Sequence, residues 1–211
     1  MTSNGAGPLR DEKMEAVQEI AGSSASSVAK KESFSSLASY IVIAVGIALF
    51  IRFLVAAPYV VAGASMEPTF YDWNYLIIDK LVYDIVPPQR GDVIVFTLPQ
   101  DSSRSLIKRV IGLPGEKIRI AGATVTIINV EHPKGFVLSE PYVAPENASK
   151  GDRIEVTLGP DQYFVLGDNR HVSADSRIWG TLPKKDISGR VDVRLYPIDM
   201  IGMLPGAARY Q

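Results

Sequence analysis

The chain has 211 residues, a formal net charge of -1 and no cysteine. This length fits one domain and a short further segment, and the near-zero charge offers no basic field for a nucleic-acid backbone. Without cysteine there is no disulfide, thiolate metal ligand or cysteine nucleophile, and His132 and His171 are too few for a histidine-rich metal site. We therefore expect no nucleic-acid partner, no metal and no cofactor, and hydrolytic chemistry would have to use hydroxyl, amine or carboxyl groups.

Residues 1–36 are rich in Ser, Ala, Gly and charged side chains. Such a segment cannot bury enough apolar surface to offset the entropy of ordering, so we predict a disordered cytoplasmic tail. Residues 37–57 (LASYIVIAVGIALFIRFLVAA) are apolar except for Ser39 and Arg52. As a helix they would span roughly 30 Å, the thickness of a bilayer core. This pattern predicts one transmembrane helix.

The charges around residues 37–57 predict the orientation of this helix. Lys30 and Lys31 precede it closely, whereas the next charges after Arg52 are Glu67 and Asp72. The positive-inside rule then places the N-terminus in the cytoplasm and the rest of the chain outside. Two alternatives remain at this stage. One is a cleaved signal peptide, because residues 62–64 read A-G-A, and the other is a buried helix of a soluble protein.

From Pro58 onward, short runs of Val, Ile, Tyr and Phe are separated by Pro, Gly, Asp and Asn, which is typical of strands joined by turns. Strands are predicted at residues 92–98, 105–111, 124–130, 153–158, 163–166 and 190–196. Polar and apolar residues alternate in the fourth and sixth of these, as in strands with one face in water. We predict a mainly β domain over residues 58–211, with an antiparallel, partly closed sheet and a smaller inserted region at about 121–162.

Two separate residues suggest nucleophilic chemistry. Ser65 lies directly after the apolar segment, among small neighbours that let a substrate backbone approach closely. Lys108 interrupts the apolar run SLIKRVI, so its ammonium group is expected to be partly desolvated, and burial lowers the pKa of a lysine. A pKa of about 7 to 8 would leave an amine able to deprotonate Ser65. Taken separately, Ser65 also fits an ordinary turn and Lys108 the solvent face of an edge strand.

Residues 167–180 (GDNRHVSADSRIWG) gather hydroxyl and charged groups in one loop after an apolar strand, and loops of this kind often hold active sites. Ser173 could donate to or accept from the Lys108 amine and orient it. An ion-pair frame around the site could be formed by Asp168, Asp175, Arg177 and Arg109. A solvated charged turn is the alternative interpretation.

Four motifs in this order resemble those of the bacterial type I signal peptidases. After the apolar segment they are S-M-x-P-T at residues 65–69, R-G-D-V-x-V-F at 90–96, K-R-V-x-G-x-P-G-E at 108–116 and G-D-N-R-x-x-S-x-D-S-R-x-W-G at 167–180. The resemblance implies a mainly β fold, in which a coiled antiparallel sheet carries a smaller β insertion and follows one N-terminal transmembrane helix. It also implies Ser65 as nucleophile, Lys108 as general base and Ser173 as the residue holding the lysine. At the Gly63 position some members have a serine that helps to hold the oxyanion, so here the oxyanion hole would rely mostly on the Ser65 backbone N–H.

The implied function is that of a membrane-bound serine endopeptidase, which removes N-terminal signal peptides from exported preproteins through an acyl-enzyme. We expect a monomer that spans the bacterial inner membrane once, with its catalytic domain on the periplasmic side, and preprotein signal peptides and the lipid bilayer as its partners. Apolar side chains that could rest on the bilayer, or else pack in the core, are Phe70, Trp73, Leu76, Met200, Ile201 and Met203.

His171-Val172 stands where the family usually has Asp-Asn, and it admits a histidine as an alternative base. Three rival functions also remain. The chain could be a Ser-Lys autoprotease like the repressors of the bacterial DNA-damage response, a relative specialised for one secretion or conjugation system, or a membrane-tethered binding domain without catalysis.

Overall fold

The computed structural model describes residues 36–49, 55–149, 151–208 and 210. They belong to two units, one ending at Ile51 and the other beginning at Arg52. In the first unit residues 36–49 form a helix, and residues 50–54 of the predicted membrane segment lie outside the described residues, as do residues 1–35 of the predicted tail. Within the described ranges, no helix has the length and apolar character needed to cross a membrane.

The predicted membrane segment extends two residues too far. Ala56 and Ala57 belong to strand β1 (Ala56–Val60), which pairs with β2 (Tyr75–Asp79). The physical reason is Pro58, which removes a backbone donor and disfavours helical geometry in the residue before it.

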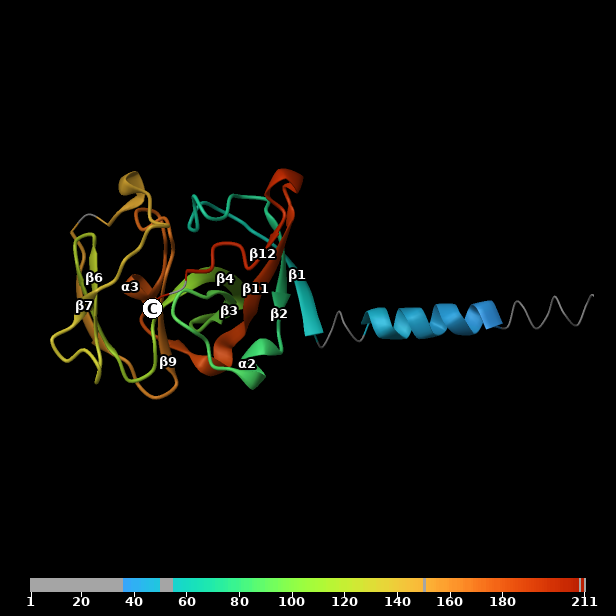
Figure 1. Cartoon of the computed structure of the whole chain (residues 1–211), viewed down its shortest axis with the longest axis horizontal. Helices are drawn as coiled ribbons and strands as arrows, with labels where there is room; N and C mark the ends of the chain where they lie inside the picture. The colour runs from blue at the N-terminus through green and yellow to red at the C-terminus, as the bar shows by residue number, and fades with distance from the viewer. Residues whose placement is uncertain (1–35, 50–54, 150, 209, 211) are drawn as a thin grey trace, which may run out of the picture. The chain divides into compact units, whose positions relative to one another are not determined.

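The second unit contains a larger antiparallel sheet with the strand order β1-β2-β11-β3-β4-β9-β10, and β12 pairs with β11 (Figure 1). The remaining strands of this sheet are β3 (Val93–Leu98), β4 (Asp101–Gly112), β9 (Gln162–Leu166), β10 (Leu182–Pro183), β11 (Ile187–Tyr196) and β12 (Gly202–Met203). Short helices connect them: α2 (Val82–Ile85), α3 (Ser176–Trp179), η3 (Lys184–Asp186) and η4 (Ile198–Met200). The expected mainly β, antiparallel fold is confirmed.

A smaller four-stranded sheet, ordered β7-β6-β5-β8, is inserted between β4 and β9 and lies to one side of the larger sheet in Figure 1. It contains β5 (Lys117–Ala121), β6 (Thr124–Ile128), β7 (Phe136–Val137) and β8 (Arg153–Thr157), with η2 (Pro145–Asn147) in a connecting loop. The sheet therefore begins before residue 121, because β5 is part of it. The sequence of β5, K-I-R-I-A, alternates in burial: Ile118 and Ile120 are buried and Arg119 is exposed.

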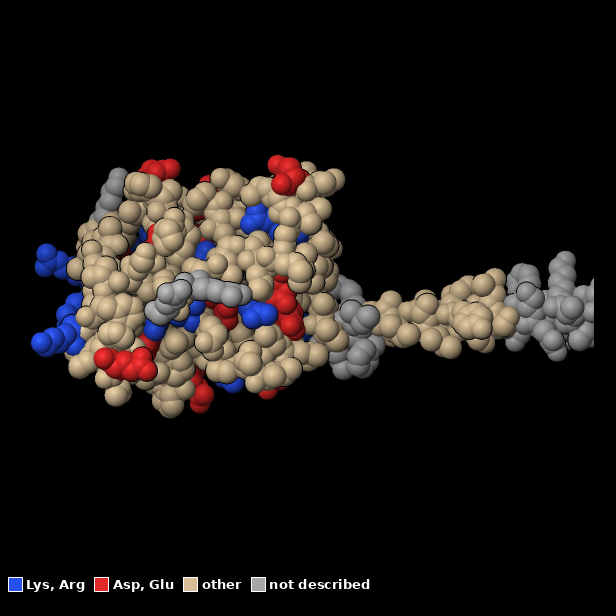
Figure 2. Space-filling model, viewed as in Figure 1, with Lys and Arg blue, Asp and Glu red and all other residues tan. Residues whose placement is uncertain are grey.

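Buried side chains from both sheets share one core cluster. Ile111 and Phe164 from the larger sheet pack in this cluster with Ile118, Val125 and Ile127 from the smaller one. Burial of this apolar surface holds the insertion against the strands that carry it. On the surface, acidic and basic side chains are interspersed, and basic ones project from the edge formed by the smaller sheet (Figure 2).

The larger sheet curves so strongly that β1 approaches β4, although three strands separate them in the strand order. The Tyr59 hydroxyl on β1 donates to Ser105 Oγ on β4 across 3.4 Å. Among the described residues, the outer edge of β1 pairs with no other strand, and β4 pairs with β9 only from Arg109 onward. Two unpaired strand edges therefore face each other near residues 59 and 105.

Candidate active site

Ser65 and Lys108 are in direct contact, as predicted. Ser65 lies in the loop after β1, and β4 carries Lys108, whose Nζ donates to Ser65 Oγ at 2.8 Å and to the Ile107 carbonyl oxygen at 2.7 Å. Lys108 is only 2% exposed. The residue sits in a run of buried side chains on β4, which explains how one lysine in an apolar strand comes to be removed from water.

Burial lowers the pKa of Lys108 to about 8, while the carboxylates of Asp175 and Asp168 act in the opposite direction. The shift from about 10.5 corresponds to roughly 3 kcal/mol against the charged form. Near neutral pH a useful fraction of the amine is therefore unprotonated. An uncharged amine in contact with a serine hydroxyl can act as a general base.

The Ser65 loop is fixed by buried side chains that follow the serine. Met66 and Phe70 are fully buried, and the Phe70 N–H donates to the Met66 carbonyl at 2.9 Å. The Ser65 carbonyl oxygen accepts the Asn169 N–H at 3.1 Å, and Thr69 Oγ1 donates to Asp168 at 2.5 Å. The loop after β9 therefore holds the serine loop in place.

Asp168 and Arg109 form one half of the expected ion-pair frame. Arg109 donates from Nε at 2.8 Å and from a terminal nitrogen at 2.5 Å to the two oxygens of Asp168, and both side chains are fully buried. A second terminal nitrogen of Arg109 donates to the carbonyl oxygens of Gly91, at 2.9 Å, and of Gly206. The Arg109 guanidinium is thus hydrogen-bonded to the Asp168 carboxylate and to two backbone carbonyl oxygens, and it fixes the orientation of that carboxylate.

Asp175 and Arg177 form the other half. The Asp175 carboxylate accepts from Arg177 Nε at 2.8 Å and from the backbone N–H of Gly167 at 3.0 Å. Arg177 also donates to Asp152 at 2.7 Å, at the border of the smaller sheet. The four charged residues predicted from the sequence therefore pair as two separate couples, with each aspartate within electrostatic reach of Lys108.

Ser173 differs from the prediction. Its buried Oγ has no hydrogen-bond partner in the part of the chain that the structure describes, so it does not hold the Lys108 amine here. It packs against Gly167, where an added Cβ would lie 2.2 Å from Ser173 Oγ and 2.4 Å from the Ser65 carbonyl oxygen. The amine instead uses its donors on Ser65 and Ile107.

Gly63 lies two residues before Ser65 in the same loop. Its N–H donates to Asp72 Oδ1 at 2.9 Å, so this donor is already used within the loop. The Ser65 N–H, by contrast, has no protein acceptor among the described residues. The oxyanion hole was expected to rely mostly on the Ser65 N–H, and this donor is available to an incoming oxyanion, whereas the Gly63 N–H is not.

His171 is exposed on the surface of the loop, whereas the Ser65 hydroxyl is bonded to Lys108. This arrangement favours the lysine over the histidine as the base. Arg170 and Glu140 form a further buried pair that was not predicted, and they are 3.0 Å apart at their longer contact. Arg170 Nε in turn donates to the Gly167 carbonyl at 2.9 Å.

A small cavity of about 80 Å³ opens beside Ser65 and Lys108. Its walls come from β1 and the following loop on one side and from β4 on the other, with Leu76 and Val95 behind. Within the described residues, no group of three or more His, Asp or Glu side chains could hold a metal ion. A serine hydroxyl bonded to a buried amine at the mouth of an apolar cavity is the arrangement of a serine hydrolase.

Comparisons with known proteins narrow this class. The family model described as "Signal peptidase, peptidase S26" matches residues 34–196. "Probable signal peptidase I-2" of Synechocystis sp. is 37% identical over 186 residues, covering 83% of this chain and 81% of the relative. "Signal peptidase I" of Leptolyngbya laminosa is 38% identical over 170 residues, covering 77% and 79%. A crystal structure of a signal peptidase I from Enterococcus faecalis is 32% identical, with a TM-score of 0.43 and coverage of 51% of this chain and 98% of that one.

The chain is therefore a hydrolase of the serine peptidase class. It belongs to the signal peptidase family, peptidase S26.

Proposed function

We propose that this chain is a membrane-bound endopeptidase that cleaves N-terminal signal peptides from exported preproteins, with Ser65 as nucleophile and Lys108 as general base. The observation that carries this proposal is the 2.8 Å contact between the Ser65 hydroxyl and a buried amine whose pKa is lowered to about 8. The names of its relatives, which are signal peptidases I, support the choice of substrate.

The reaction begins when the neutral Lys108 amine takes the Ser65 proton and Ser65 Oγ bonds to the scissile carbonyl carbon. The oxyanion that forms accepts a hydrogen bond from the Ser65 backbone N–H, which has no other acceptor among the described residues. Collapse breaks the C–N bond, and Lys108 returns its proton to the leaving amine, which leaves an ester on Ser65. Lys108 then takes a proton from a water molecule as its oxygen attacks the ester carbonyl carbon. When the bond to Ser65 Oγ breaks, Lys108 gives this proton to Ser65 Oγ, and the acid product leaves.

The substrate enters as an extended strand between the unpaired edges of β1 and β4. Backbone groups along both edges can pair with such a strand, as in other cases of strand addition. The scissile bond then lies beside Ser65, at the end of this channel. The cavity of about 80 Å³ takes the side chain that precedes the cleaved bond, and this volume suits a small residue.

Ser173 is proposed to hold Lys108 once Ser65 carries the acyl group. At that stage Ser65 Oγ is part of an ester and is a poorer acceptor, so the amine needs another partner. The Ser173 hydroxyl is buried beside the Ser65 carbonyl and is unpaired among the described residues. It can turn to the amine at no cost in lost hydrogen bonds.

Membrane attachment is proposed through the apolar segment that begins at Leu37 and ends before strand β1, with the N-terminus in the cytoplasm and the catalytic domain outside. In the described part of this segment, residues 36–49 are helical, and Leu37, Ile41 and Val45 each expose about half of their surface. Exposed apolar side chains of this kind suit contact with lipid.

A second apolar surface belongs to the catalytic domain. Trp73 is 73% exposed and Met203 is 80% exposed, and Met200 and Ile201 are exposed beside it in sequence. Phe70 and Leu76, which were candidates for the same surface, are fully buried and pack in the core. We propose that the four exposed residues touch the bilayer at the level where signal peptides arrive.

Cleavage of a purified preprotein by the full chain in detergent tests the function. Ser65→Ala and Lys108→Ala should each abolish cleavage, whereas Ser139→Ala and Lys134→Ala, at exposed positions, should leave it unchanged. Cleavage that survives Ser65→Ala would rule out the mechanism. Absence of cleavage by the wild-type chain would favour a binding domain, and cleavage of the chain itself in place of the preprotein would favour an autoprotease.

The substrate pocket and the anchor are tested separately. Preproteins with Ala, Val or Phe before the cleaved bond should be cleaved in that order of efficiency, and efficient cleavage after Phe would contradict the pocket assignment. For the anchor, the full chain should stay in membranes washed with alkaline carbonate and leave only with detergent. Release by carbonate would contradict a spanning segment.

A further inference from the structure

The segment from Leu204 to Ala208, together with Tyr210, packs against residues that hold Asp168 beside the catalytic centre. This segment and Tyr210, which we name the strap, follow β12 and lie outside residues 34–196 that the family model matches. The strap is fixed at its start by the Leu204 N–H, which donates to the Asp192 carbonyl at 2.6 Å. Three residues of the strap, Gly206, Ala208 and Tyr210, then make contacts near the buried Arg109 and Asp168 pair.

Gly206 makes the first contact. Its carbonyl oxygen accepts from Arg109, the residue that holds Asp168. A Cβ at Gly206 would lie 2.2 Å from the Thr69 methyl carbon, so the glycine packs directly on the serine loop. Because Thr69 Oγ1 donates to Asp168, Gly206 touches both partners of that carboxylate.

Ala208 makes the second contact. An added Cβ at Gly91 would lie 1.9 Å from the Ala208 carbonyl oxygen, so the two backbones are in close contact. The Gly91 carbonyl oxygen accepts from Arg109 at 2.9 Å. The same guanidinium nitrogen therefore binds one carbonyl on each side of the contact, from Gly91 and from Gly206.

Tyr210 makes the third contact, with the inserted region. Its hydroxyl lies 2.8 Å from the Tyr142 hydroxyl, and the Tyr142 ring stacks on the Arg109 guanidinium at 3.8 Å. Tyr142 also donates to Glu140 at 2.9 Å, and Glu140 holds Arg170. Tyr210 thus links the strap to Tyr142, whose ring contacts Arg109 and whose hydroxyl donates to the carboxylate that holds Arg170.

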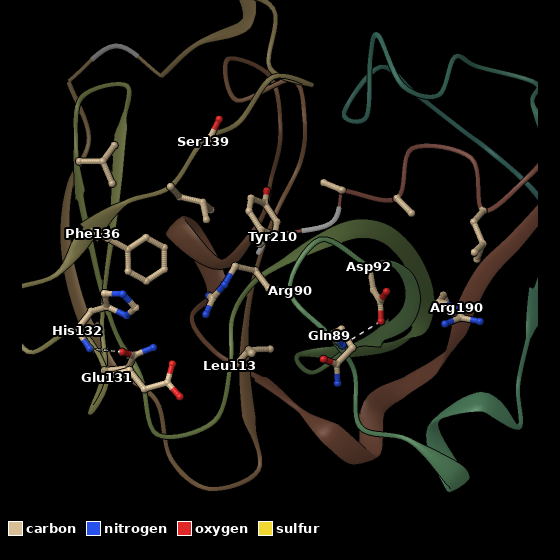
Figure 3. A pocket seen from close by; sticks show the side chains of 16 residues that line it. Gln89, Arg90, Asp92, Leu113, Glu131, His132, Phe136, Ser139, Arg190 and Tyr210 are labelled. Carbon is tan, nitrogen blue, oxygen red and sulfur yellow. Dashed lines mark hydrogen bonds between the residues drawn. The ribbon is translucent and has the colours of Figure 1, made fainter.

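Figure 3 shows Tyr210 beside Arg90 in a cavity of about 780 Å³, with Phe136 of β7 and Ser139 of the following loop on one side and Gln89 and Asp92 on the other. This cavity is lined by Ala207, Ala208 and Tyr210 but not by Ser65 or Lys108. The strap thus forms part of the wall of this cavity, and through Gly206 it also contacts Arg109.

We infer that the strap is a positioning element for the reaction: Gly206 and Tyr210 hold Arg109 and Tyr142 in place, and through Asp168 and Thr69 they set Ser65 against Lys108. This inference rests on the proposed function. It predicts that disturbing the strap slows the chemical step and leaves substrate binding intact, because the substrate channel lies between β1 and β4.

The test compares kcat and KM of the full chain with those of Gly206→Ala, Tyr210→Phe and Tyr210→Ala. Displacing Thr69 should lower kcat about 100-fold in Gly206→Ala, as small misplacements of reacting groups commonly do. Loss of one hydroxyl in Tyr210→Phe should lower kcat about fivefold, and Tyr210→Ala should lower it further. KM should change less than about twofold in all three, because uniform binding is untouched.

Matched controls separate contact from backbone strain. Gly202→Ala is on the adjacent β12 and meets no atom within 4 Å, and Gly122→Ala has a similar positive φ of +60° but open space around it. Both should keep the wild-type kcat, and Tyr196→Phe, at an exposed tyrosine, should do so too. If Gly206→Ala and Gly122→Ala fall together, strain and not the strap contact is responsible, and the inference is wrong.

Titration of the Lys108 amine by NMR provides a readout that needs no turnover. In the strap variants, water should reach the amine, and its pKa should rise from about 8 towards the ordinary lysine value, with the acid limb of the rate profile moving by the same amount. Unchanged titration and unchanged kcat would overturn the inference. If the wild-type chain cleaves no preprotein, the proposed function fails, while the titration still decides whether the strap shapes the site.

Discussion

The backbone N–H of Asn169 donates to the carbonyl oxygen of Ser65 across 3.1 Å. This bond joins the loop after β9 to the loop after β1, and Lys108 on β4 holds the same serine by its side chain. Because β4 and β9 are paired strands, with Arg109 opposite Leu166, both supports of Ser65 belong to one rigid part of the sheet. Rigid elements of this kind keep reacting groups within the narrow geometry that catalysis needs.

The rate of cleavage should depend on pH through Lys108. Only the neutral amine accepts the Ser65 proton, and burial lowers its pKa to about 8. We expect kcat/KM to rise about tenfold per pH unit below pH 8 and to level off above it. Initial rates between pH 6 and pH 9.5 check this expectation, and a limb near pH 4 would indicate a carboxylate base instead.

Lys108→Met should increase the free energy of unfolding more at pH 7 than at pH 10.5. The folded pKa of about 8 lies below the ordinary value of 10.5, so the unfolded chain binds the proton more tightly between these values. Wild-type stability therefore rises with pH across this window, whereas the variant has no such gain.

The advantage of Lys108→Met should consequently shrink by about 3 kcal/mol between pH 7 and pH 10.5. Urea unfolding of both proteins at the two pH values measures it. Lys134→Met replaces an exposed lysine and serves as the control, for which we expect no comparable change. An equal change in the two variants would mean that water reaches Lys108.

Asp168→Asn should destabilise the domain strongly. The substitution leaves the Arg109 charge buried without its partner, and both side chains are fully buried in the wild-type chain. Breaking such a pair typically costs about 3 to 5 kcal/mol, whereas replacing both partners by apolar residues costs much less. Thermal unfolding of Asp168→Asn and of the double variant Arg109→Met/Asp168→Leu tests this order, and additive losses would contradict it.

Ser173→Ala should leave stability unchanged or raise it by about 1 kcal/mol, because the buried hydroxyl has no partner among the described residues. Cleavage should nevertheless slow by about tenfold if this hydroxyl holds the lysine in the acyl-enzyme. Burst kinetics separate the two steps, since only hydrolysis of the acyl-enzyme should slow. A normal rate of hydrolysis would remove Ser173 from the mechanism.

Much of the site was predictable from the sequence. A lysine within an apolar run indicates a buried amine, and Lys108 is indeed buried on β4, which begins four residues earlier than the predicted strand and ends one residue later. The charged residues of the loop after β9 were predictable as ion-pair partners because they lie close together in the chain or on the neighbouring β4. Strands β3 and β9 were also predicted, because a short apolar run bounded by turn residues indicates a buried strand.

Other features depend on segments that are distant in the sequence. Glu140 meets Arg170, and Asp152 meets Arg177, only because the insertion folds back on the loop after β9. No local pattern distinguishes these carboxylates from exposed ones. β7, β10 and β12 contain two residues each, too few to show a period. β5 was missed although its alternation of apolar and other residues was visible in the sequence.

The facing edges of β1 and β4 have a consequence for what the protein can admit. An isolated sheet edge readily pairs with the edge of another folded sheet, which leads to aggregation. Here Tyr59 and Ser105 touch across the gap, so each edge shields the other from a bulky partner. A single unfolded chain can still thread between them. Under the proposed function, the curvature of the sheet would therefore restrict entry to polypeptides that have not yet folded.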